Sequence, residues 1–494
     1  MFKKFKKTMP ILLSVLLAVL PACSSANPEA QSEKTEAAGP EAVQAEQEIQ
    51  EETDYLDSLP TENMNGESIR FIARHGTGGR INFPEESLTG ETVNDSLYTR
   101  NDLLMSRYNV KIENNIVDSS GTLTSTTQTS IAAGEDAYDV IFADMADTAR
   151  TLVVNNMLMD YSGVPTVDLS QRWWSQHNGD LSLGGKQFFP TGVITPQYFN
   201  SLYLMLFNQQ LAVNYNVGDL YDLALEGRWT LDQLDSILAI ATQDLNGDGQ
   251  MDLDDQWSMV YDEVAGFAFY FGVGGKMTEF DEEGMPYLNI TSDQVIDLVE
   301  RLRSVVGDKE LCLRGEDYSK DSEQTIFREG RSLFVANTLF HVRTVYREMD
   351  NDYGFLPMPK YDENQKNYYS YAQPWSGTGV AIPVTNSKID DTGLILEAMA
   401  YLSESYVRDS MFETTYKEKL ARDERTAQIL DIVTEGARFD LNVMFNWGGS
   451  GNLLRDAVLG NNTTYASSSA RIMKVADRAI EDLCETIRGM EWYN

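Results

Sequence analysis

The sequence has few cysteines, few histidines and few basic residues, and each shortage argues against a class of function. Among 494 residues there are three Cys and three His, and 39 Lys and Arg stand against 76 Asp and Glu, for a formal net charge of −37. Because binding to a phosphate backbone needs a basic surface, we expect no nucleic-acid partner. The scattered histidines leave little for a histidine-based metal centre, and no apolar run reaches the roughly 20 residues of a membrane-spanning helix. The remaining composition, 42% hydrophobic and 10% aromatic, is typical of a large folded chain.

The first 66 residues predict an exported chain tethered to a membrane. Residues 1–22 combine four lysines with an apolar run, as a signal peptide does. Residues 20–23 (LPAC) resemble a bacterial lipobox, in which the signal is cut before Cys23 and the Cys23 thiol is lipidated; the alternative is an ordinary secretory signal with an incidental cysteine. Residues 23–66 are acidic and contain almost no large apolar residues before Tyr55, so they predict a lipid-anchored, disordered linker. We therefore expect the protein at the extracellular face of the cytoplasmic membrane, or on the periplasmic side in a diderm bacterium.

Beyond residue 66, strand and helix patterns alternate, which predicts an α/β fold with parallel sheets. Amphipathic helices are predicted over residues 230–242 and 291–306, each opening with a Thr-x-x-Gln capping pattern. Short strands are predicted at residues 68–74, 138–143, 332–336 and 378–384. In such sheets ligands bind beyond the carboxyl ends of the strands, which places Arg74 and Asp144 at a candidate ligand-binding rim.

A series of oxygen donors between residues 244 and 255 predicts a calcium loop. The donors occupy loop positions 1, 3, 5, 7, 9 and 12, and Gly249 stands at position 6, where the turn is tight. They are Asp244, Asn246, Asp248, Gln250 (through its carbonyl), Asp252 and Asp255. Oxygen ligands at this spacing suit a hard cation, so we expect a structural Ca²⁺, with the helix predicted over residues 230–242 entering the loop. The loop departs from the EF-hand pattern at position 12, where Asp255 replaces the usual Glu, and a solvated acidic turn is the alternative.

Several short motifs also follow one another in a recognisable order. After the lipobox and the acidic linker come the strand at Ile69, Tyr138-Asp139-Val140-Ile141, Phe327-x-x-Gly330-x-x-x-Phe334, residues 354–359 and Thr378-Gly379-Val380-Ala381-Ile382. This series resembles the family 1 extracellular solute-binding proteins, the maltose-binding-like lipoproteins of ABC importers in Gram-positive bacteria. The resemblance implies a periplasmic-binding-protein-like, two-lobed (venus flytrap) fold with an inter-lobe cleft and C-terminal helices. Lobe 1 would comprise residues 67–190 and 360–410, and lobe 2 residues 191–359 and 411–494.

A carbohydrate site in such a cleft needs aromatic faces and a few polar groups, because sugars present C–H faces and hydroxyl edges. Trp375 stands just before a predicted strand. By the resemblance, Trp447 matches the position where an aromatic residue at a helix start stacks on sugar in maltose-type binders. Asn337 and His341 follow another predicted strand and share the strand-end position of Asp144. Packing in the core is the alternative for these residues, and a helix N-cap is the alternative for Asp144.

The resemblance implies a receptor that captures a carbohydrate, most simply a neutral oligosaccharide, and delivers it to the permease of an ABC importer. We expect a monomer, and the acidic charge favours neutral or cationic ligands. Two alternatives stay open: a binding protein for a peptide or polyamine, and a secreted carbohydrate-active enzyme. We expect no enzyme, because no HExxH, GxSxG, Walker A or CxxC motif occurs and no carboxylate pair stands out. Cys312 and Cys484 remain after lipidation of Cys23, and we expect buried thiols, with a disulfide as the alternative.

Overall fold

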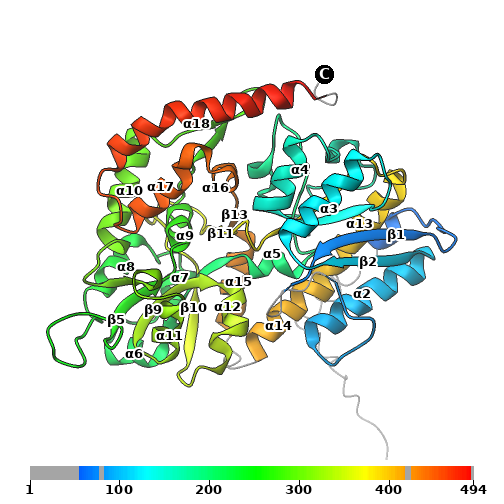
Figure 1. Ribbon diagram of the computed structural model, residues 1–494. Helices are drawn as coiled ribbons and strands as arrows, with labels where there is room; N and C mark the ends of the chain where they lie inside the picture. Colours follow the sequence, from blue (N-terminus) through cyan, green and yellow to red (C-terminus); the bar gives the residue numbers. More distant parts are fainter. Residues whose placement is uncertain (1–54, 77–82, 418–423, 491–494) are drawn as a thin grey trace, which may run out of the picture. The chain divides into compact units, whose positions relative to one another are not determined.

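The computed structural model describes residues 55–76, 83–417 and 424–490, and these form one compact body that begins at Tyr55 (Figure 1). The predicted signal peptide, the lipidation site Cys23 and the linker up to residue 54 lie outside the described residues. The linker prediction is wrong for residues 55–66, which belong to the body. The Tyr55 hydroxyl donates a hydrogen bond to Glu397 Oε1 at 2.6 Å, and Leu59 and Met64 are buried. The few apolar residues of this segment are therefore enough to pack it onto the fold.

The first sheet has four strands in the order β12-β3-β1-β2. Its strands are β1 (Ser68–Arg74), β2 (Lys111–Val117), β3 (Val140–Asp144) and β12 (Thr378–Ala381). β1 pairs in parallel with both β2 and β3, whereas β12 runs antiparallel to β3. β3 is buried along its whole length, because helices such as α2 (Thr92–Tyr108), α3 (Ser120–Ala132) and α13 (Ile389–Ser403) pack around this sheet.

The second sheet has five strands in the order β10-β4-β9-β5-β8. Its strands are β4 (Tyr203–Asn208), β5 (Trp257–Tyr261), β8 (Cys312–Arg314), β9 (Ser332–Thr338) and β10 (Tyr353–Leu356). β5 runs parallel to β8 and β9, while β4 runs antiparallel to β9 and β10. Every residue of β4, β5 and β9 is buried, which explains why these segments are mainly apolar. The α/β prediction is confirmed, with one antiparallel strand in each sheet: β12 in the first and β4 in the second.

Three chain segments lie side by side between the two sheets. β11 (Ser370–Tyr371) pairs in parallel with β13 (Ala437–Arg438), and Ala372 forms an antiparallel bridge with Leu202. The chain therefore passes between the sheets at three places that contact one another.

The C-terminal part is helical, as predicted, and covers elements beside both sheets. Its helices include α16 (Leu441–Phe445), α17 (Ser450–Val458) and α18 (Tyr465–Arg488). α18 packs against α17, against β7 (Pro286–Leu288) and α10 (Asp293–Val306) beside the second sheet, and against α4 (Arg150–Val154) beside the first (Figure 1). None of the described helices is both long and apolar enough to cross a membrane.

The ends of the predicted helices differ from those in the structure where neighbouring polar residues compete to cap the helix or where the helix is shorter than its pattern. The helix predicted over residues 230–242 is α8 (Leu231–Leu238), so it ends before the predicted calcium loop begins. In α10 the cap is Ser292, one residue after the Thr291 that the capping pattern indicated, because the Ser292 hydroxyl accepts the Val295 N–H. After β3 the chain continues directly into a π-helical turn (Met145–Ala149) that leads into α4.

Cys312 and Cys484 are both buried, and both are free thiols. The buried-thiol prediction is confirmed, and the disulfide alternative is wrong. Burial raises the pKa of both thiols, so they are poor nucleophiles.

Candidate functional site

Three of the predicted ligand-binding residues meet at the edge of the first sheet. Arg74 is the last residue of β1, Asp144 is the last residue of β3, and Trp375 lies three residues before β12. β3 pairs with both neighbouring strands, and its Asp144 lies opposite Thr378 of β12. The Arg74 Nε donates a hydrogen bond to Asp144 Oδ1, and Arg74 Nη2 donates to the Trp375 carbonyl at 3.4 Å. We call these three residues the strand-end site.

The strand-end site combines an aromatic face with polar groups that are only partly used. The Trp375 side chain is 40% exposed, whereas Asp144 is 3% exposed. Asp144 Oδ2 is itself buried, and within hydrogen-bond geometry it has no partner among the described residues. Burial raises the pKa of Asp144, and the neighbouring Arg74 and the Ser120 side chain act against that rise. An exposed indole beside a guanidinium–carboxylate pair is a combination of groups that recognises the C–H faces and hydroxyls of a sugar.

The carboxyl edge of the second sheet carries an acidic group that the sequence analysis missed. Asp262 follows β5 and accepts hydrogen bonds from the Tyr203 hydroxyl, at 2.8 Å on Oδ2, and from the Ala265 N–H, at 3.0 Å on Oδ1. Burial raises the pKa of Asp262 to about 7, and the negative charge of Glu316 adds to the rise. The available signal was the apolar run of β5 followed directly by an Asp, because a strand end is where a ligand-facing carboxylate is expected.

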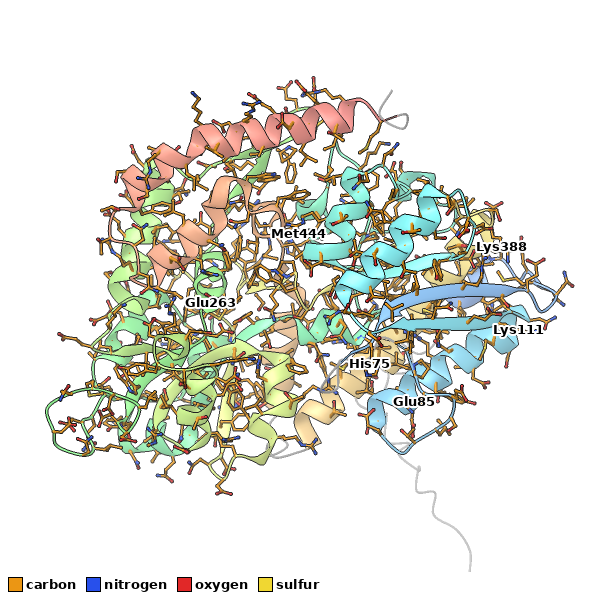
Figure 2. All side chains as sticks on the ribbon, viewed as in Figure 1. His75, Glu85, Lys111, Glu263, Lys388 and Met444 are labelled. Carbon is orange, nitrogen blue, oxygen red and sulfur yellow. The ribbon has the colours of Figure 1, made fainter. Side chains whose placement is uncertain are left out.

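Two contacts join the C-terminal helices to both edges (Figure 2). Arg150 Nη1, in α4, donates to the Met444 carbonyl, in α16, at 2.9 Å. On the other side, Arg455 of α17 pairs with Glu263, which follows Asp262, at 3.3 Å. The segment after the third crossing, at Ala437–Arg438, is therefore held against α4 beside the first sheet and against Glu263 after β5 of the second.

The other predicted ligand-binding residues pack inside the protein. Asn337 is 1% exposed, and its Nδ2 donates to the Tyr346 hydroxyl at 3.3 Å. His341 is partly buried in α12 (Leu339–Thr344), where its Nδ1 lies 2.8 Å from the Thr338 hydroxyl. Trp447 is 4% exposed and stacks on Phe445 with ring centroids 5.2 Å apart, so this neighbour already covers one face of the indole. The structure does not bring these three residues to the strand-end site.

The donors of the predicted calcium loop accept hydrogen bonds from the loop's own backbone. Asp244 Oδ2 accepts the Gly249 N–H at 2.9 Å, and Asn246 Oδ1 accepts the Asp248 N–H at 2.8 Å. Asp255 is fully buried and accepts the N–H groups of Leu245 and Asp252, at 2.9 and 2.8 Å. Within the described chain, no group of three or more His, Cys, Asp or Glu side chains is arranged to hold a metal ion. In this structure the loop is closed by its own hydrogen bonds.

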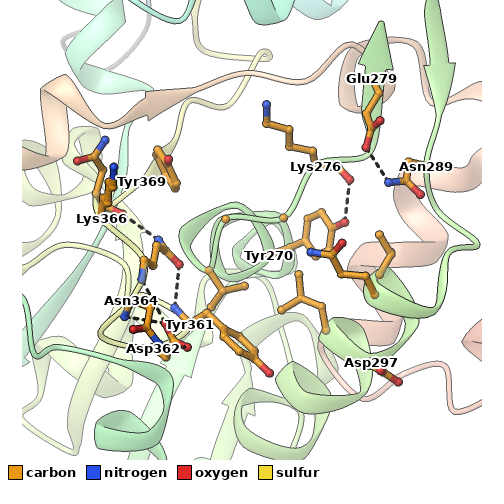
Figure 3. Close-up of a pocket in the computed structure, with 18 residues that line it drawn as sticks. Tyr270, Lys276, Glu279, Asn289, Asp297, Tyr361, Asp362, Asn364, Lys366 and Tyr369 are labelled. Atoms are coloured by element: carbon orange, nitrogen blue, oxygen red, sulfur yellow. Dashed lines mark hydrogen bonds between the residues drawn. The ribbon is translucent and has the colours of Figure 1, made fainter. Parts of the chain in front are cut away.

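The structure also contains a large cavity away from the strand-end site (Figure 3). Its volume is about 980 Å³, and it lies between the end of α9 (Ala265–Gly272), α10, the hairpin of β6 (Thr278–Phe280) and β7, and residues 361–369. We call it the α9–α10 cavity. Tyrosine, lysine and amide side chains line it, among them Tyr270, Lys276, Tyr361, Lys366 and Tyr369. These residues come from distant parts of the chain, so no short sequence motif predicted the cavity.

No protein-family model and no curated protein matches the sequence. The fold is nevertheless similar to solved structures. The maltose/maltodextrin-binding domain MalE of Bdellovibrio bacteriovorus, bound to maltotriose, is 13% identical with a TM-score of 0.52, and the match covers 84% of this chain and 100% of that one. UspC of M. tuberculosis is 16% identical with a TM-score of 0.55, over 83% and 100% of the two chains. A cyclo/maltodextrin-binding protein complexed with maltotetraose is 12% identical with a TM-score of 0.52, over 87% and 100%. At these identities the likeness is one of fold, and it confirms the predicted two-lobed, periplasmic-binding-protein-like architecture.

Proposed function

We propose that this protein is the substrate-binding component of an ABC importer and that its ligand is a carbohydrate. The observation that carries the proposal is the strand-end site. It presents an exposed Trp375 beside the Arg74–Asp144 pair, at the sheet edge where two-lobed α/β proteins bind ligands. Two of the similar structures, both binding proteins, hold maltotriose and maltotetraose, which favours a saccharide.

Each of the three residues has a role in this proposal. The Trp375 indole stacks on the C–H face of a sugar ring, and the Asp144 carboxylate accepts hydrogen bonds from sugar hydroxyls. Arg74 holds the Asp144 carboxylate in place, and its guanidinium donates to ring or hydroxyl oxygens. The site has acceptors and donors but no activated nucleophile, so we propose binding without catalysis. The alternatives are a peptide or a polyamine as the ligand, or a glycoside that the protein hydrolyses. The experiment below distinguishes them from the proposal by whether saccharides bind and whether they are shortened.

The proposal extends to the membrane. We propose that Cys23 is lipidated and that the acidic segment up to residue 54 tethers a monomeric body to the extracellular face of the membrane, beside the permease that accepts the sugar. The lipobox-like residues 20–23 and the composition of this segment support the tether. Incorporation of a labelled fatty acid into wild type, and its absence from Cys23→Ser, tests the anchor.

Calorimetric titration of the purified chain from residue 55 with maltotriose and a panel of neutral oligosaccharides tests the binding function. We expect a saturable heat signal, and Trp375→Ala should weaken binding by about tenfold to a hundredfold, since an aromatic platform contributes roughly 1–3 kcal/mol. Tyr318→Ala is the control, because Tyr318 is an aromatic residue of similar exposure (46%) away from the strand-end site. Failure of every saccharide to bind would refute the carbohydrate proposal, and release of shortened sugars would refute the binding-only role.

We also infer that the loop from Asp244 to Asp255 takes a structural Ca²⁺. The spacing of its oxygen donors supports this, as does the left-handed conformation of Gly249 at φ +81°, at the position where a calcium loop turns sharply. Binding would draw the carboxylates of Asp244 and Asp248 from the backbone N–H groups toward the ion.

A further inference from the structure

The α9–α10 cavity holds two lysine side chains beside the carboxylates of Glu279, Asp297 and Asp362. Lys276 and Lys366 are both exposed, and within the described part of the chain neither ammonium group has a hydrogen bond or salt bridge. The Arg438 guanidinium lies 5.0 Å from the centre of the Tyr369 ring, and the His177 ring lies 6.3 Å from it. Arg438 pairs with Asp180 at 2.8 Å, whereas in the described structure neither lysine ammonium contacts a carboxylate directly; the charge of Lys276 acts on Glu279 from a longer distance and lowers its pKa.

The electrostatic field at this place agrees with that arrangement. Burial lowers the pKa of His177, and the positive charges of Arg438 and Lys276 lower it further, while Asp180 acts in the opposite direction. The positive charges of Arg438 and Lys276 therefore both act at this place, although the whole chain carries a charge of −37. Figure 3 shows Lys276 extending between Tyr369 on one wall and Glu279 on the other.

The carboxylates in the cavity wall are already used by the protein. Glu279 accepts hydrogen bonds from the Tyr287 hydroxyl and from Asn289 Nδ2, both at 2.7 Å. Asp362 accepts the N–H groups of Asn364 and Gln365. The Asn364 side chain and these backbone N–H groups lower the pKa of Asp362, and the hydrogen bonds from Tyr287 and Asn289, with the charge of Lys276, lower the pKa of Glu279, so both carboxylates are engaged. A third acid, Asp297, lies on the opposite rim from the lysines in Figure 3. The groups left to recognise a ligand are therefore mainly donors, and the strongest are two ammonium groups.

The remaining lining suits sugar rings. Tyr361 is 45% exposed, and Tyr369, which also lines the cavity, is partly exposed. Amide side chains, including Gln294 and Asn367, complete the polar part of the lining. A volume of about 980 Å³ is enough for a ligand of several rings.

We propose that the α9–α10 cavity is a second binding site, separate from the strand-end site, for an oligosaccharide that carries carboxylates. Tyr361 and Tyr369 provide the aromatic faces, and Lys276 and Lys366 bind the carboxylates of uronic acid units. The local lysines overcome the overall acidic charge because a charge-assisted hydrogen bond acts at contact distance, whereas salt screens the distant carboxylates.

Calorimetric titration with trigalacturonate, with neutral maltotriose run in parallel, tests this proposal on the chain from residue 55. Wild type should bind trigalacturonate. Lys276→Ala and Lys366→Ala should each weaken it about tenfold, and the double variant about a hundredfold. Lys111→Ala is the matched control, because Lys111 is an exposed lysine on β2, away from the cavity (Figure 2). All three lysines altered in these variants are exposed, and unchanged melting temperatures verify that the variants are folded.

Trp375→Ala separates this site from the proposed carbohydrate site. Trigalacturonate binding should survive Trp375→Ala, and any maltotriose binding should survive the double lysine variant. Absence of trigalacturonate binding in wild type, undiminished binding in the double variant, or loss of binding in Trp375→Ala would each overturn the second site. None of these results depends on whether maltotriose binds. The test of the second site is therefore independent of the test of the proposed function.

Discussion

Glu397 offers the sharpest test of how the N-terminal segment is attached to the body. Its carboxylate is buried in α13, and each oxygen accepts two hydrogen bonds. Oε1 accepts from the Tyr55 hydroxyl at 2.6 Å and from Trp173 Nε1 at 3.1 Å. Oε2 accepts from Trp174 Nε1 at 3.0 Å and from the Asp168 N–H at 3.3 Å. Burial raises the pKa of Glu397, and the donors oppose that rise.

The substitution Glu397→Gln replaces one of these oxygens by an NH₂ group, which cannot accept a hydrogen bond. The two groups that donated to that oxygen are then left without an acceptor. Two hydrogen bonds to a charged group are lost, each contributing roughly 1.5–3 kcal/mol, and we expect a loss of about 3–5 kcal/mol in the free energy of unfolding. Tyr55→Phe removes one hydrogen bond from a partly exposed donor and should cost about 1–2 kcal/mol.

Urea denaturation at pH 8, followed by tryptophan fluorescence, measures these differences. Glu329→Gln is the matched control, because Glu329 is 52% exposed and pairs with Arg331 on the surface, so its loss should cost less than about 1 kcal/mol. If Glu397→Gln were no less stable than Glu329→Gln, the four hydrogen bonds would not hold this part of the fold. Limited proteolysis gives a second measurement, since Glu397→Gln should expose the chain after residue 54 to cleavage.

Two further predictions concern charge. Because burial raises the pKa of Asp262 to about 7, the stability that this residue contributes is present below about pH 4 and is lost as the pH rises through 7. The Asp262→Asn side chain cannot ionise, so between pH 4 and pH 8 the free energy of unfolding of this variant should fall by about 1–3 kcal/mol less than that of wild type. Parallel pH profiles of the two proteins in urea denaturation would contradict this prediction. For the proposed calcium loop, CaCl₂ at about ten times Kd should stabilise the chain by about 1.4 kcal/mol, and EDTA should reverse the rise in melting temperature. Asp248→Asn should abolish that rise, whereas Asp254→Asn, which changes a carboxylate outside the donor positions, should keep it; a wild-type melting temperature indifferent to calcium would rule the site out.

Strands and their order along the chain could be read from the sequence because their signals are local. β3 and β9 are mainly apolar, as burial on both faces requires, and β1 is an apolar-rich run followed by His75-Gly76. Helix ends were less accurate because several polar residues compete for one cap, as Thr291 and Ser292 do at the start of α10. The end of the linker was misplaced because Tyr55 is anchored by Glu397, a residue 342 positions away.

For the candidate site, strand-end position identified Arg74 and Asp144, because parallel neighbouring strands end at the same edge. The same reasoning was insufficient for Asn337, since packing against Tyr346 turns its side chain into the core. Trp447 has the residue type and helix-start position of a sugar platform, but Phe445 stacks on it. Residue type and local position do not specify which side of a segment faces solvent.

By itself, the sequence determined the acidic charge, the alternation of strands and helices and the donor spacing of the loop at 244–255, because composition and periodicity are properties of neighbouring residues. Only the tertiary structure decided that Trp375 meets Arg74 across 301 positions, that Asp262 is buried against Tyr203, and that Lys276 and Lys366 share a cavity with Tyr369. Contacts between distant segments depend on how the two sheets and their crossings pack. That packing is a property of the whole chain, and no short segment encodes it.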